Sequence, residues 1–108
     1  MAELLISYGS NINEKDNDGK TTLHTVAYNN SKEIAELLIS YGININEKDK
    51  SGKTPLHYAA ENNSKEAAEL LISHGININE KDKYGKTALH YAAEFKEMVE
   101  ILISNGAN

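Results

Sequence analysis

Apolar residues in the middle of the chain recur at the spacing of one helix face. Positions i, i+3 and i+4 of this stretch are occupied by Leu56, Ala59 and Ala60, and this spacing forms one stripe along an α-helix. Thr54, just before them, can cap the free N–H groups of the first turn. Pro55 suits the first helical position because it has no N–H to leave unpaired. The pattern predicts a helix at about residues 55–61.

A second helical pattern follows at about residues 65–73. Its wide apolar face consists of Ala67, Ala68, Leu70, Leu71 and Ile72. Ser64 stands where it can cap the first turn. Gly75 is the left-handed residue expected just past a helix end, and Ile76 should then fold back on Leu71. The two patterns together predict a pair of helices.

The whole unit recurs at a fixed offset of 33 residues. Lys53-Thr54-Pro55-Leu56-His57 is preceded by Lys20-Thr21-Thr22-Leu23-His24 and followed by Lys86-Thr87-Ala88-Leu89-His90. A fixed period of this size indicates a repeat array. The predicted organisation is a single domain, 1–108, with a half repeat at 1–12 and repeats at 13–45, 46–78 and 79–108. The first two complete repeats differ at only eight of 33 paired positions.

The third repeat is two residues shorter between its helices. Phe95 alone replaces the Asn62-Asn63-Ser64 link of the second repeat. One outcome is a continuous helix over 90–104, and the other is a shortened first helix with Glu94-Phe95-Lys96 as the turn. We predict the shortened pair, with Phe95 against the solenoid end. Each buried aliphatic side chain is worth roughly 1.5–3 kcal/mol, whereas each regained hydrogen bond is worth only about 0.5–1.5 kcal/mol.

Composition and charge exclude several function classes. The net charge is −5, and all eleven basic residues are lysines, so the chain is poorly suited to bidentate recognition of bases or phosphates. The absence of cysteine excludes disulfides, thiolate metal sites and a cysteine nucleophile. No apolar run approaches the roughly 20 residues that span a bilayer. We therefore expect neither a nucleic acid nor a membrane as partner.

The candidate chemical residues favour structural roles. His24, His57 and His90 recur with the repeat, but stacked helices would separate them by roughly 8–10 Å. That separation is too large for one zinc ion with ligands at about 2 Å. The glutamates on the predicted helices pair with no plausible nucleophile, and the glycines stand singly, so no phosphate loop is present. We expect no catalytic residue, no metal and no cofactor.

The repeated motif resembles the ankyrin repeat. The matching residues are Asp49, Gly52, Thr54, Pro55, Leu56, His57, Ala59, Ala60, Leu70, Leu71, Gly75 and Asn79. The resemblance implies an all-α solenoid of antiparallel helix pairs with hairpin-like finger turns. It also implies a non-catalytic protein–protein interaction module with an intracellular, cytoplasmic location.

In the resembling family, partners are bound through the finger tips and the inner face of the first helices. Carried over to this chain, the partner-binding positions are Asn17, Asp18, Lys20, Tyr28, Asn29, Lys50, Ser51, Lys53, Glu61, Asn62, Lys83, Tyr84, Lys86 and Glu94. We call these fourteen residues the predicted surface. Tyr28 and Tyr84 are its expected anchors, since tyrosine offers a large contact area with a polar tip.

Several alternatives stay open at this point. Near-identical repeats also suit an architectural spacer or an engineered scaffold with no specific partner. The opening half repeat is either a natural cap or the mark of a cut from a longer array. The apolar Leu4, Leu5 and Ile6 favour the cut, because a cap carries a polar outer face. Uncovered apolar surface at both solenoid ends predicts end-to-end self-association.

Overall fold

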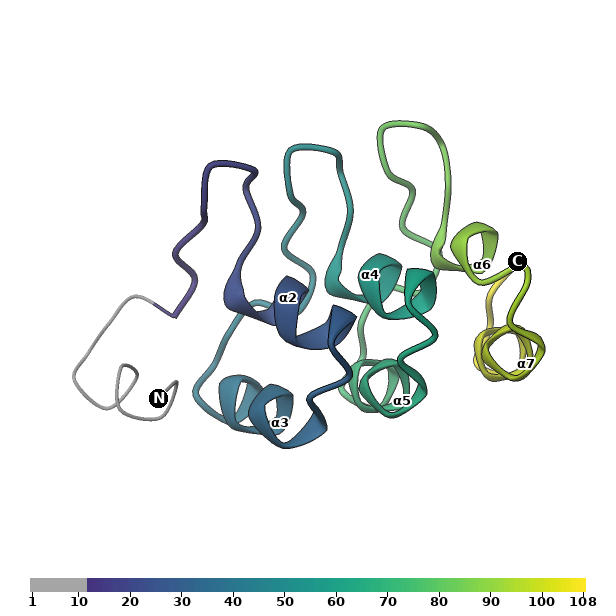
Figure 1. The fold of residues 1–108 in the computed structure, drawn as a ribbon, viewed down its shortest axis with the longest axis horizontal. Coiled ribbons are helices and arrows are strands. Elements are labelled where there is room, and N and C mark those ends of the chain that lie inside the picture. The colour runs from purple at the N-terminus through teal and green to yellow at the C-terminus, as the bar shows by residue number, and fades with distance from the viewer. Residues whose placement is uncertain (1–11) are drawn as a thin grey trace.

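A computed structural model describes residues 12–108, and within this range the chain forms six helices and no strand (Figure 1). Their bounds are α2 Thr22–Tyr28, α3 Lys32–Ser40, α4 Pro55–Glu61, α5 Lys65–Ser73, α6 Ala88–Tyr91 and α7 Lys96–Ser104. The bounds of α4 and α5 agree with the two predicted helices. The half repeat predicted at the start of the chain lies almost entirely outside the described residues.

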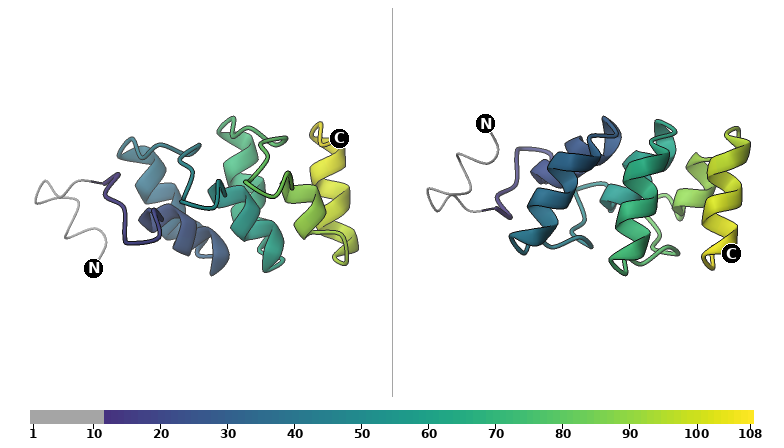
Figure 2. Two further views of the ribbon diagram at one scale, coloured as in Figure 1. Left: turned by 90° about the horizontal axis from the view of Figure 1, so that it is seen from above. Right: turned by 90° about the horizontal axis from the view of Figure 1, so that it is seen from below.

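The helices form two parallel rows beneath a row of finger-like loops. In Figure 1 the first helices α2, α4 and α6 lie next to the fingers, and the second helices α3, α5 and α7 lie on the other side. The two views of Figure 2 show the same progression along the long axis. Each repeat thus supplies one finger and one helix pair, and the predicted all-α solenoid is confirmed.

The core lies between the two helix rows. Leucines from both helices of a repeat fill it, and Leu23, Leu38, Leu56, Leu71 and Leu102 are each at most 2% exposed. Alanines such as Ala27 and Ala59 are fully buried, so neighbouring first helices approach closely. Each of these buried leucines contributes roughly 1.5–3 kcal/mol of burial free energy.

The second helices end as the sequence predicts. Gly75 has φ +88°, and its N–H donates to the Ile72 carbonyl at 3.0 Å. The Ile76 N–H donates to the Leu71 carbonyl at 3.1 Å. These two bonds define a Schellman motif, which satisfies carbonyls that the helix end leaves unpaired.

The prediction that the Ser64 side chain caps the first turn of α5 is wrong. Ser64 does occupy the N-cap position of α5, but its side chain caps no helical N–H. The Ser64 hydroxyl instead donates to the Tyr28 carbonyl of the preceding repeat at 2.8 Å. The third N–H of α5, that of Ala67, donates to the Asn30 side-chain oxygen at 2.9 Å. The preceding repeat thus supplies the cap, because Tyr28 ends α2 and needs a donor for its own free carbonyl.

The third repeat has the predicted shortened helix pair. α6 ends at Tyr91, residues 92–94 form the turn, and Phe95 is the N-cap of α7. The turn lies slightly earlier than the predicted Glu94-Phe95-Lys96, because the Phe95 N–H closes it onto the Ala92 carbonyl at 2.7 Å. The Phe95 side chain is partly buried against the core, as predicted.

Candidate functional site

Each finger of repeats 2 and 3 is held by an aspartate at its base. One oxygen of Asp49 accepts hydrogen bonds from the Ser51 and Lys53 N–H groups, both at 2.9 Å. Asp82 holds the next finger in the same way. Aspartate side chains commonly stabilise turns by such bonds. The fingers are therefore built by their own sequence rather than by a partner.

Backbone bonds also fix the distance between fingers. The Lys50 N–H donates to the Asp18 carbonyl at 2.9 Å, and the Lys83 N–H donates to the Ser51 carbonyl at 2.8 Å. Gly52 permits this approach, since a Cβ there would lie 3.0 Å from the Lys83 nitrogen. Finger-tip side chains consequently stand at regular intervals along the solenoid.

The structure leaves all fourteen residues of the predicted surface accessible to solvent. Lys20, Ser51 and Lys53 are partly buried, and the other eleven are exposed. Lys20, Tyr28 and Glu61 come together around a pocket of about 280 Å³, and His24, Thr25 and Tyr58 complete its walls. Asn62 has a different task, because its side-chain amide donates to the Tyr28 carbonyl at 2.8 Å. It therefore also links repeats 1 and 2.

Sequence reasoning missed two tyrosines at the centre of this surface. Tyr58 and Tyr91 lie between lysines that belong to successive repeats, and their order is Lys20, Tyr58, Lys53, Tyr91 and Lys86. We call these five residues the Lys–Tyr row. The Nζ atom of Lys53 is 5.2 Å from the centroid of the Tyr58 ring and 4.8 Å from that of Tyr91. Such distances correspond to cation–π contacts.

The tyrosine hydroxyls are anchored to the aspartates that shape the fingers. Tyr58 donates to Asp49, and Tyr91 donates to Asp82. Burial raises the pKa of Tyr58 well above its ordinary value, and the bond to Asp49 raises it further. The ring positions are thus fixed before any partner arrives.

A sequence signal for this arrangement exists. The Asp–Tyr pairs have a spacing of nine residues in both repeats, Asp49 with Tyr58 and Asp82 with Tyr91, whereas Asp16 of the first repeat is followed at this distance by Thr25. Asp49 and Asp82 are buried while Asp16 is exposed. Burial opposes ionisation of Asp82, but its hydrogen bonds from Tyr91 and from two backbone N–H groups prevail and lower its pKa.

The regular 33-residue spacing of the histidines has a structural explanation. The Thr54 N–H donates to His57 Nδ1 at 3.0 Å, so the ring proton resides on Nε2. His57 Nε2 then donates to the Lys86 carbonyl of the next repeat at 3.0 Å. His24 bonds Thr21 and Lys53 in the same way. Both ring nitrogens are occupied, which agrees with the predicted structural role, and no group of potential metal ligands is found in residues 12–108.

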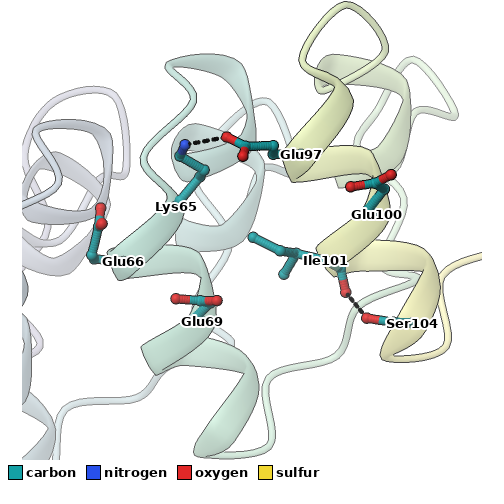
Figure 3. Close-up of a pocket in the computed structure, with 7 residues that line it drawn as sticks. All are labelled: Lys65, Glu66, Glu69, Glu97, Glu100, Ile101 and Ser104. Carbon is teal, nitrogen blue, oxygen red and sulfur yellow. Dashed lines mark hydrogen bonds and ion pairs between the residues drawn. The ribbon is translucent and has the colours of Figure 1, made fainter.

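A second hollow lies on the opposite side, between α5 and α7 (Figure 3). Its volume is about 510 Å³, and the Lys65–Glu97 ion pair closes one end at 2.6 Å. The remaining lining residues are Glu66, Glu69, Glu100, Ile101 and Ser104. Phe95 offers no hydroxyl to make the bond that Ser64 makes to the preceding repeat. Within the described residues α7 also has no counterpart of the bond from the Ala67 N–H of α5 to Asn30.

No helix within residues 12–108 has the length and apolar character needed to cross a membrane.

Comparison with known proteins identifies the repeat. A search of curated proteins found no match to the chain. The family model described as ankyrin repeats (three copies) matches residues 1–82 and 50–108, so the two matches together cover the whole chain. Proteins built from this repeat generally mediate protein–protein interactions and are typically non-catalytic. The chain therefore belongs to the ankyrin-repeat family.

Proposed function

We propose that the chain is a protein-binding module, part of a longer ankyrin array, that contacts its partner through the predicted surface. The observation that carries this proposal is the position of the differences between repeats 1 and 2. Three of the pairs that differ, Asn17/Lys50, Asp18/Ser51 and Tyr28/Glu61, fall on the fingers and the ends of the first helices. The finger aspartates, glycines and capping threonines, in contrast, are the same in both repeats.

The scaffold supports this assignment because it presents those positions rigidly. Finger-to-finger bonds and buried aspartates fix the backbone, while the varying side chains point to solvent. A preorganised surface loses less conformational entropy on binding than a mobile one. Tyr84 lies at the tip of the third finger and is 63% exposed, more than Tyr28, the other tyrosine of the predicted surface.

The test begins with a defined binder, selected from a displayed library of peptides and small domains against the full chain. Tyr84→Ala should weaken its binding by about tenfold or more, the loss expected for a tyrosine anchor. Lys50→Ala should also weaken it. Glu36→Ala on α3 is the matched control and should have no effect, because α3 lies in the helix row away from the fingers (Figure 1). Unchanged affinity of the selected binders for both the Tyr84→Ala and the Lys50→Ala variants would contradict the proposal.

An architectural spacer remains the second candidate, because the first two repeats differ at only eight of 33 paired positions. Further near-identical repeats on both sides of the chain would favour the spacer, whereas an attached catalytic domain would favour partner recruitment.

End-to-end self-association is a separate proposal. Ile103 is 54% exposed, and His90 is exposed where its counterparts in repeats 1 and 2 are buried. Such a face can stack on the end of a second molecule. Light scattering over increasing protein concentration should show a rising mean mass, and a constant monomer mass up to millimolar protein would reject it.

A further inference from the structure

The Lys–Tyr row has a spacing that matches one kind of ligand. We propose that it binds an acidic segment of the partner protein in a polyproline II conformation, with a carboxylate at every third residue. This inference rests on the proposed function and deepens it, because it names the chemistry that the partner presents. It concerns Lys20, Lys53 and Lys86 and the two tyrosine rings between them.

The charge of the molecule is divided between two sides. The predicted surface contains five lysines and three acidic residues, although the chain as a whole has a net charge of −5. Each second helix, in contrast, has one lysine and two glutamates. The Asp49 and Asp82 carboxylates lie beside the row and are held by hydrogen bonds, so with them this side has five lysines and five acidic residues. An acidic partner thus meets less repulsion at the row than at the second helices, each of which has a surplus of one negative charge.

The lysines of the row are available to a carboxylate. Within residues 12–108, no ion pair is recorded for Lys20 or Lys86, which lie 5.3 and 5.7 Å from the centroids of the Tyr58 and Tyr91 rings. Lys53 is 3.3 Å from Glu61. Glu61 is therefore an internal competitor for the central lysine, and an incoming carboxylate must displace it or share the ammonium group with it.

The repeat fixes the distance between these ammonium groups. Neighbouring repeats stack at roughly 8–10 Å, the usual spacing of packed helices. A polyproline II segment rises about 3.1 Å per residue with three residues per turn, so residues i and i+3 lie on one face about 9 Å apart. In a β-strand, residues on one face recur at about 6.6 Å. Carboxylates at every third residue of a polyproline II segment therefore match the spacing of the lysines. Carboxylates at every second residue of a β-strand would lie too close together.

The tyrosines give the intervening residues a surface to pack on. Tyr58 and Tyr91 are partly buried, with their hydroxyls held by the finger aspartates, so their rings cannot turn away. Aromatic rings are a surface on which proline-rich segments commonly dock. Because each ring lies between two lysine Nζ atoms, the residues between the carboxylates would contact the rings at their exposed edges.

The test uses two labelled synthetic peptides in fluorescence anisotropy titrations with the full chain at low salt. The first repeats Glu-Pro-Pro three times, and the second has the same composition with its three glutamates contiguous. The first should bind more tightly. Lys53→Gln should weaken it two- to fivefold, the effect of an exposed ion pair of about 0.5–1 kcal/mol. Glu61→Gln should strengthen it, because the competitor is removed.

Lys96→Gln on α7 is the matched control, with the same change of charge on an exposed residue of the second-helix row. Equal binding of the two peptides, no binding of the first, or equal weakening by Lys96→Gln and Lys53→Gln would overturn the proposal. Equally tight binding of single-stranded DNA of matched charge would also overturn it, since it indicates unspecific attraction of anions. If the peptide fails while selected binders still depend on Tyr84, the inference fails and the proposed function stands.

Discussion

The inter-repeat hydrogen bond of His57 should make a large contribution to stability. His57 is 1% exposed, accepts a bond from the Thr54 N–H and donates one to the Lys86 carbonyl. His57→Ala leaves the Thr54 N–H without a partner and removes one of the two bonds to the Lys86 carbonyl, which still accepts a bond from the Asp82 N–H at 2.9 Å. An unsatisfied buried polar group costs about 1–3 kcal/mol, and a lost hydrogen bond costs about 0.5–1.5 kcal/mol. We therefore expect a loss of about 1.5–4 kcal/mol in the free energy of unfolding.

His90 provides a matched control within the same chain. It accepts the corresponding bond from the Thr87 N–H at 3.0 Å, but it is exposed and no bond from its Nε2 atom is recorded within residues 12–108. His90→Ala therefore removes the local bond alone, at an expected cost of about 0.5–1.5 kcal/mol. The difference between the two variants isolates the link between repeats.

Urea unfolding followed by circular dichroism measures both losses. The slopes of the transitions must agree with that of the original chain for the comparison to hold. Equal losses for the two variants would refute the reasoning, because the bond between His57 and the Lys86 carbonyl would then contribute nothing. A loss below about 1 kcal/mol for His57→Ala would refute it as well.

Three further predictions concern acid stability, the fingers and the shortened link. Burial lowers the pKa of His24 and His57 in the folded chain, so the unfolded chain binds protons first as the pH falls. The free energy of unfolding should therefore decrease below about pH 6.5. A urea midpoint that rises between pH 7 and 5.5 would contradict this prediction. Gly52→Ala should lower the thermal midpoint more than Gly85→Ala. The two glycines have similar dihedral angles, with φ +80° at Gly52 and +76° at Gly85. A Cβ at Gly52 would lie 3.0 Å from the Lys83 nitrogen, whereas a Cβ at Gly85 would meet no atom within 4 Å. Equal shifts of the thermal midpoint for the two variants would contradict the importance of this close approach. Replacing Phe95 with Asn-Asn-Ser should raise the urea midpoint by restoring hydrogen bonds worth about 0.5–1.5 kcal/mol each, and an unchanged midpoint would count against the capping argument.

The helices could be predicted from the sequence because their signals are local. α4 has its apolar stripe, its Thr54 cap and its Pro55 within a single stretch, and its predicted bounds agree with the structure. The Schellman end of α5 follows from Gly75 and Ile76 in the same way. Even the interrupted helix pair around Phe95 could be derived by comparing burial with hydrogen bonding. The partner-binding role of the predicted surface stays a prediction.

The features that sequence reasoning missed depend on contacts between repeats. Asn30 caps α5 by accepting the N–H of Ala67, which lies 37 residues further along the chain. The Ser64 hydroxyl donates to the Tyr28 carbonyl and does not cap its own helix. Both bonds depend on how the repeats stack, which a local sequence pattern does not contain. The same holds for the Lys–Tyr row, where each tyrosine lies beside a lysine of its own repeat and a lysine of the repeat before.

Side-chain hydrogen bonds join the link between the helices of repeat 1 to the corresponding link of repeat 2 and to α5, and they have a consequence for how the molecule opens. Asn30, Asn62 and Ser64 join repeats 1 and 2, whereas the second helices of repeats 2 and 3 are joined by one exposed ion pair. Repeat proteins open by nearest-neighbour steps, and weakly joined segments exchange their amide hydrogens first. Amides of α7 should therefore lose protection through detachments that leave repeats 1 and 2 folded, so that the solenoid frays from repeat 3.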